Sequence, residues 1–177
     1  MKNLITYSAL LSLVVFSACN QKPTDSNDGT VVVSTVDSSD IYNSSDLKNL
    51  ALAINATDKD ALQQAIDAIK NMDVKYWAIA VTVKTDNGLV EAVQKTQNAD
   101  IKYAAFAMSG NDTTQTTQIL DKVNEADIKH LAEAYLYKAD AAQHIGEIKN
   151  ARLKNLALSI TSNTSEDKTK YANAIAE

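Results

Sequence analysis

The order of apolar and polar positions over residues 44–177 predicts a series of short amphipathic helices. Five segments open with an acidic or basic residue, then an aliphatic residue, then lysine, and they recur at a nearly constant spacing. The opening residues, here called offset 0, are Asp46, Asp73, Asp100, Asp127 and Arg152. Offsets 1, 4, 5 and 8 share one helical face at about 100° per residue. Such self-similarity at a fixed period is typical of a repeat protein.

A second apolar pattern follows each of these segments, after residues that favour turns. In the first repeat it comprises Leu62, Ala65 and Ile66, behind the turn at residues 57–58. Each repeat is therefore predicted to be two short helices, with the offset-0 aspartate as the N-cap of the first. One pair cannot bury its apolar face alone, whereas stacked pairs can. The predicted fold is all-α, a right-handed α-solenoid (superhelix) of about five 27-residue helix pairs.

The phrase Asp-Val-Lys-x-x-Ala-x-Ala at residues 73–80 resembles the phrase that opens a helix in HEAT-like repeats, the short bacterial type included. The spacing departs from that family, since HEAT and armadillo repeats run to about 40–47 residues. The shorter period of this chain requires shorter helices. The resemblance implies a scaffold or adaptor surface, and it carries over no particular ligand.

Residues 1–18 are predicted to be a signal peptide, with Lys2 before an apolar run over residues 9–16. That run is shorter than the roughly 20 apolar residues of a membrane span. Residues 16–19, Phe-Ser-Ala-Cys, resemble the lipobox of bacterial lipoproteins, with phenylalanine where that family prefers leucine. The resemblance implies that Cys19 is lipidated and becomes the new N-terminus. The alternative is an ordinary secretory signal, with Cys19 removed or left as a free thiol.

Residues 19–43 are predicted to be the lipidated N-terminus and a flexible tether, because they are rich in Ser, Asp, Asn and Thr. The apolar stretch at residues 31–36 either caps the first repeat or belongs to the tether. Asn20 follows the cysteine, in place of the aspartate that resembles an inner-membrane retention signal. The predicted location is the cell envelope, with the outer membrane favoured over the inner in a Gram-negative host.

Composition and charge narrow the classes of function. The net charge is -5 and no basic stripe is present, so nucleic acid is not a predicted partner. His130 and His144 fall on different predicted helices, without cysteine partners, so their spacing predicts no metal site. The chain has no Gly-rich phosphate loop and no nucleophile elbow. The sequence therefore predicts no catalytic residue and no cofactor.

Offset 6 lies at about 240° around the helix axis from offset 0, away from the core face. It is nevertheless apolar in four of the five repeats, with Glu133 as the exception. Offset 3 lies beside it. A regular apolar and aromatic column on the outside would bind a peptide or a partner helix. The predicted partner-binding residues are Leu52, Tyr76, Ile79, Tyr103, Phe106, His130 and Leu158. The alternative is that neighbouring repeats or the tether bury offset 6.

Three classes of function follow from this pattern. The favoured hypothesis is a membrane-anchored lipoprotein that acts as a protein-interaction scaffold or adaptor in the cell envelope. The alternative is an exclusion, immunity or inhibitor lipoprotein directed at a foreign toxin, phage or conjugation component. An enzyme is not favoured, because it would need a cluster of titratable groups with perturbed pKa values in a pocket, and none is evident from the sequence.

Overall fold

The computed structural model describes residues 41–83, 86–110 and 113–176, which belong to one compact unit, Thr35–Glu177. In these ranges it contains ten α-helices and no β-strand, so the predicted all-α class is confirmed. The helices are α1 (Ser44–Asn55), α2 (Lys59–Ala68), α3 (Met72–Thr82), α4 (Asp86–Lys95), α5 (Ala99–Ser109), α6 (Thr113–Leu120), α7 (Ala126–Leu136), α8 (Ala141–Glu147), α9 (Ala151–Thr161) and α10 (Ser165–Ala174). None of these ten helices has the length and apolar character that crossing a membrane requires. The predicted signal peptide, Cys19 and residues 31–36 lie outside the described residues.

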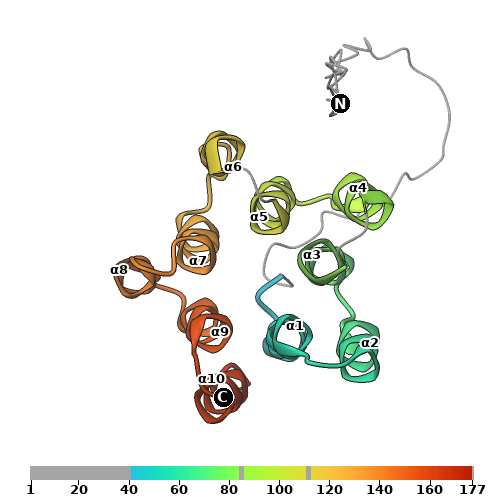
Figure 1. The fold of residues 1–177 in the computed structure, drawn as a ribbon, viewed down its shortest axis with the longest axis vertical. Helices are drawn as coiled ribbons and strands as arrows, with labels where there is room; N and C mark the ends of the chain where they lie inside the picture. Colours follow the sequence, from blue (N-terminus) through green and yellow to red (C-terminus); the bar gives the residue numbers. More distant parts are fainter. Residues whose placement is uncertain (1–40, 84–85, 111–112, 177) are drawn as a thin grey trace, which may run out of the picture. The chain divides into compact units, whose positions relative to one another are not determined.

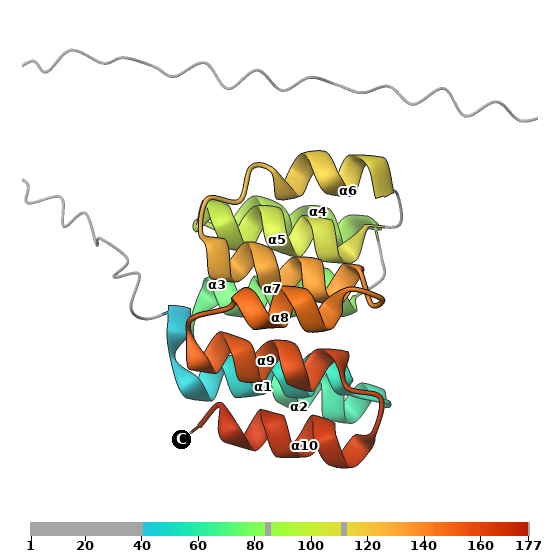
Figure 2. The same ribbon diagram turned by 90° about the vertical axis from the view of Figure 1, so that its left-hand side faces the viewer.

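The odd-numbered helices form an inner ring and the even-numbered helices lie outside it (Figure 1). Along the chain each inner helix packs against the next one, and α9 packs against α1. Each outer helix lies against the inner helix that precedes it in the chain. Seen from the side, the helices lie side by side with their axes roughly aligned (Figure 2). The five inner helices therefore surround one common core.

The first and last helix pairs are in contact, which departs from the predicted superhelix. Asn55 Nδ2 at the end of α1 donates to Ser159 Oγ of α9 at 3.1 Å. Arg152 Nη1 at the start of α9 donates to the carbonyl oxygen of Tyr42 at 3.2 Å. In an open superhelix the two terminal pairs would be far apart. Here successive rotations of one pair relative to the next bring the fifth pair back to the first, so the ring is closed.

The predicted core face is confirmed at offsets 1, 4 and 5, whereas offset 8 is buried in three inner helices and partly buried at Ile54 and Tyr135. Offsets 1, 4 and 5 are buried in all five inner helices. The largest of these side chains is Trp77 of α3, which is 1% exposed and donates through Nε1 to Met108 Sδ of α5 at 3.3 Å. Offset 7 is buried as well, and it holds only small residues: Ala53, Ala80, Ala107, Ala134 and Ser159. Each inner helix has two inner neighbours and an outer helix, so its buried face is wider than the sequence pattern indicated.

The offset-0 aspartates are not the N-caps of their helices, contrary to the prediction. In four of the five inner helices the side-chain cap is an asparagine, and the caps are Asn43, Asn71, Asn98 and Asn150. The aspartates lie two or three residues beyond the N-cap. In α1, α3 and α5 the capping asparagine already accepts from amides of the first turn, whereas α7 has no side-chain cap. Their carboxylates are therefore available to accept from amides elsewhere.

Each aspartate binds the loop that leads into the next repeat. Asp73 Oδ1 and Oδ2 accept from the backbone amides of Gln97 and Asn98 at 2.6 and 3.1 Å. Asp46 accepts in the same way from Lys70 and Asn71 at 2.8 and 3.0 Å. Asp127 accepts from Lys149 and Asn150, and Asp100 accepts from Asn124. We call these four residues, Asp46, Asp73, Asp100 and Asp127, the loop-binding aspartates. They connect successive repeats through charge-assisted hydrogen bonds.

Arg152 occupies the same position in the last repeat, where the next loop around the ring is the segment before α1. Its guanidinium donates to a backbone carbonyl oxygen of that segment. The loop-binding aspartates, in contrast, accept from backbone amides. Ile41 of this segment is buried in the core. Burial raises the pKa of Tyr42 to about 12, with smaller contributions from the negative charges of Glu125, Asp127 and Asp100. The Tyr42 hydroxyl is therefore within electrostatic range of the acidic residues at the N-terminal ends of α5 and α7.

Candidate functional site

The predicted partner-binding residues lie at the outer surface of the ring, with unequal exposure. Leu52 is 41% exposed and Phe106 is 39% exposed. The other five are partly buried: Tyr76, Ile79, Tyr103, His130 and Leu158. Of these, Tyr76, Ile79, Tyr103 and Leu158 also pack against the edge of the core. Two of the apolar side chains at offset 6, Ile79 and Leu158, are therefore partly buried, and the other two, Leu52 and Phe106, are exposed.

These residues do not form one continuous column, because outer helices separate them. Leu52 lies in a hollow of about 510 Å³ between α2 and α10. Leu158 lies in another, of about 730 Å³, between α8 and α10. Tyr76 lines a third, of about 550 Å³, beside Lys95 at the end of α4. The described surface thus offers several separate hollows, each with an inner helix at its base.

The hollow around Leu52 combines an apolar base with amide groups. We call it the α2–α10 hollow, and its lining residues are Asn49, Leu52, Asn55, Ala56, Thr57, Ala61, Gln64, Ala65, Ser165, Lys168 and Thr169. The Asn55 amide is held by Ser159, whereas Leu52 is exposed. Apolar walls with a few polar groups are typical of ligand-binding hollows, and the volume is in the usual range. Such a lining suits an apolar side chain whose backbone can bond to amides.

Lysines from the ends of outer helices cover the tyrosines at offset 3. Lys95 Nζ lies 5.9 Å from the ring centroid of Tyr76, and Lys122 Nζ lies 5.6 Å from that of Tyr103. Lys95 also pairs with Glu91, and this hydrogen bond and charge raise the pKa of Lys95. Cation–π contacts at exposed sites are weak, so a partner could displace these lysines at low cost.

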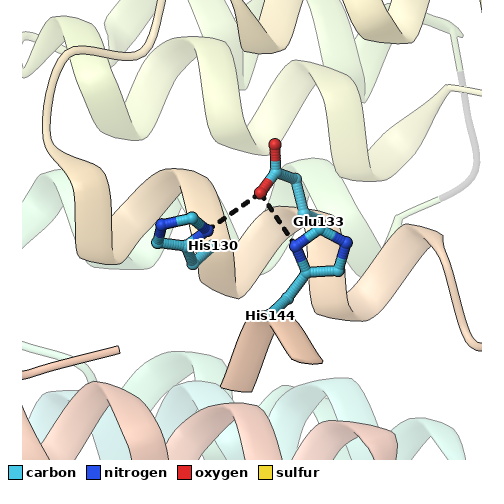
Figure 3. A group of neighbouring side chains, drawn as sticks. All are labelled: His130, Glu133 and His144. Carbon is cyan, nitrogen blue, oxygen red and sulfur yellow. Dashed lines mark hydrogen bonds and ion pairs between the residues drawn. The ribbon is translucent and has the colours of Figure 1, made fainter. Parts of the chain in front are cut away.

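His130 belongs to a different kind of group, one that the sequence did not predict (Figure 3). Its Nδ1 lies 3.0 Å from Glu133 Oε2, and His144 Nδ1 lies 3.1 Å from the same oxygen. His130 and Glu133 are on α7, and His144 is on α8. The three side chains are 30%, 16% and 20% exposed. We call them the His–Glu–His cluster.

The arrangement of the cluster follows from helix geometry. Residues three apart on a helix are neighbours on its surface, which places His130 beside Glu133. His144 reaches the same oxygen from α8, the second helix of the same pair. The sequence did not indicate this proximity, because His144 is far from His130 along the chain. A useful signal was present, because Glu133 interrupts the apolar series at offset 6 and has a histidine three positions before it. Imidazole and carboxylate groups within 4.8 Å of one another could hold a metal ion or form a hydrogen-bonded group.

Comparisons with protein-family models, with curated proteins and with solved structures found no match to this chain. The likeness of residues 73–80 to HEAT-like repeats therefore remains a resemblance of a short phrase.

Proposed function

We propose that this chain is a lipoprotein of the cell envelope, anchored through Cys19, whose helical ring binds a protein partner on its outer surface. The five helix pairs are copies of one unit that follow each other in a right-handed sense. The regular recurrence of the opening phrase and the repeated contacts of the loop-binding aspartates support the common unit. The signal-peptide pattern and the lone cysteine support the anchor.

The observation that carries the proposal is the exposed Leu52 at the base of the α2–α10 hollow. The partner that fits this lining is a protein segment that inserts one or two apolar side chains. Asn49 and Gln64 in the lining supply amides for its backbone, and Lys168 supplies a positive charge. A buried apolar anchor surrounded by polar groups is the usual composition of a binding hot spot.

Replacing Leu52 with aspartate is expected to weaken partner binding at least about tenfold, because a solvated carboxylate would replace the apolar side chain at the base of the hollow. The measurement is cross-linking of the full chain to envelope proteins, followed by affinity measurement with the captured protein. Val90→Asp is the matched control, because Val90 is 52% exposed on α4 and does not line the hollow. A partner bound equally by wild type and Leu52→Asp would overturn the proposed surface.

The same experiment separates the two envelope functions. A partner encoded by the host and resident in the envelope supports a scaffold or adaptor. A partner supplied only by a phage, a toxin or a conjugating cell supports the exclusion, immunity or inhibitor function instead.

The lipid anchor is tested separately. The wild-type chain is expected to incorporate a labelled fatty acid and to fractionate with membranes, because two or more acyl chains hold a protein durably on a bilayer. Cys19→Ser should lose both the label and the membrane association. Absence of label from the wild type would refute the anchor and leave the surface proposal untouched.

A further inference from the structure

We propose that the His–Glu–His cluster is a binding site for one divalent transition-metal ion, with zinc as the ion of choice. His130 Nδ1, Glu133 Oε2 and His144 Nδ1 are the ligand atoms. Two imidazoles and one carboxylate form a ligand set that zinc accepts, and three protein ligands leave a fourth position open. This inference does not depend on the partner-binding surface proposed above.

The helices hold the ligand residues in place without an ion. On α7, the residues between His130 and Glu133 are Leu131 and Ala132, and both are fully buried. On α8, the residue after His144 is Ile145, whose side chain is buried against the core. Three buried residues thus place three ligands from two helices at one point on the outside of the ring. Pre-positioned ligands lower the ordering cost of binding.

The distances are close to those that a metal ion needs. Zinc bonds of about 2.0–2.1 Å in a tetrahedron separate the ligand atoms by about 3.4 Å. The two nitrogens lie 3.0 and 3.1 Å from the shared oxygen, and all three ligand atoms lie within 4.8 Å of one another. Small rotations of the imidazole rings are therefore sufficient to receive an ion.

Charge and access also fit a cation. The Glu133 carboxylate supplies one negative charge, and neutral imidazoles add none. Lys129, the nearest cation along α7, is paired with Asp121 at 3.3 Å and so is partly neutralised. The ligand side chains are 16–30% exposed, which leaves a path for the ion while removing much of the competing water.

A bound ion would join α8 to α7. The seven-residue α8 is the shortest described helix, and Ile145 is its one buried residue. A metal ion bound by His144 of α8 and by His130 and Glu133 of α7 would add a direct connection between the two helices beyond their side-chain packing. Metal binding should therefore raise the melting temperature.

The test is a titration of the full chain, prepared without a histidine tag, with Zn²⁺ followed by calorimetry and by NMR of the imidazole rings. His130 and His144 are the chain's only two histidines, so each ring signal reports on one ligand. One equivalent of Zn²⁺ is expected to bind, to shift both ring signals, and to raise the melting temperature by about 5 °C or more at saturation. Co²⁺ in its place should give the visible absorption of a four-coordinate ion.

The variants separate a metal site from a hydrogen-bonded group. Glu133→Gln keeps the shape of the side chain and should weaken Zn²⁺ binding by about 100-fold or more, as should His144→Gln. Glu147→Gln is the matched control, because Glu147 is exposed on α8 outside the cluster, and it should bind as wild type does. Circular dichroism without metal verifies that each variant is folded. No binding by the wild type, or unchanged binding by folded Glu133→Gln, would show that the cluster is held by hydrogen bonds only.

Discussion

Replacing Trp77 with alanine is expected to lower the free energy of unfolding by about 3–5 kcal/mol. Trp77 is 1% exposed and contacts α5 through the bond from its indole nitrogen to the Met108 sulfur. Truncation removes the largest buried side chain of the ring and leaves a cavity that the rigid helix pairs cannot fully close. The measurement is urea denaturation followed by circular dichroism, because the variant lacks the only tryptophan.

Two controls define the cause of that loss. Trp77→Phe keeps most of the apolar volume and should cost clearly less than Trp77→Ala. Met72→Ala removes a side chain that is 52% exposed on the same helix, and it should change stability by less than about 0.5 kcal/mol. Equal stability of Trp77→Ala and Met72→Ala would mean that α3 does not pack on a common core as described.

Replacing Asp73 with alanine is expected to cost about 2–4 kcal/mol, although this residue carries no apolar surface. Its buried carboxylate accepts the backbone amides of Gln97 and Asn98, and the variant would leave both amides without that acceptor. Asp73→Asn retains one acceptor oxygen and should fall between wild type and alanine. Thermal and urea denaturation of the three proteins measure the order.

Asp67 provides the matched control for that prediction. It lies on α2, is exposed, and accepts from Gln63 within its own helix rather than from another repeat. Asp67→Ala should therefore change the free energy of unfolding by less than about 0.5 kcal/mol. If Asp73→Ala and Asp67→Ala were equally stable, the loop-binding aspartates would contribute nothing to the connection between repeats.

The outer-surface site was predicted from the sequence only in part. The sequence left open whether offset 6 is exposed or buried by neighbouring repeats, and the structure leaves Leu52 and Phe106 exposed. Ile79 and Leu158 share the same offset and are partly buried, because they pack against the edge of the core. His130 shares its offset with the tyrosines of the predicted surface, but its neighbours are Glu133 and His144, because α8 lies beside α7.

The sequence by itself determined the helices, their pairing along the chain and the buried face of each inner helix. A period of 3.6 residues and the recurrence of apolar offsets are local properties, and burial of Leu47, Trp77 and Leu131 follows from them. The role of Asp73 was not local, because its acceptor function became visible only with the loop of the next repeat beside it.

Closure of the ring and assembly of the His–Glu–His cluster were decided by tertiary structure alone. The angle between successive pairs depends on how the side chains of neighbouring helices interlock, and helical periodicity carries no information about that angle. The contacts of Asn55 with Ser159 and of Arg152 with Tyr42 therefore join residues more than a hundred positions apart that no local pattern relates. Packing within a single pair brings His144 to Glu133, because it fixes how α8 lies against α7.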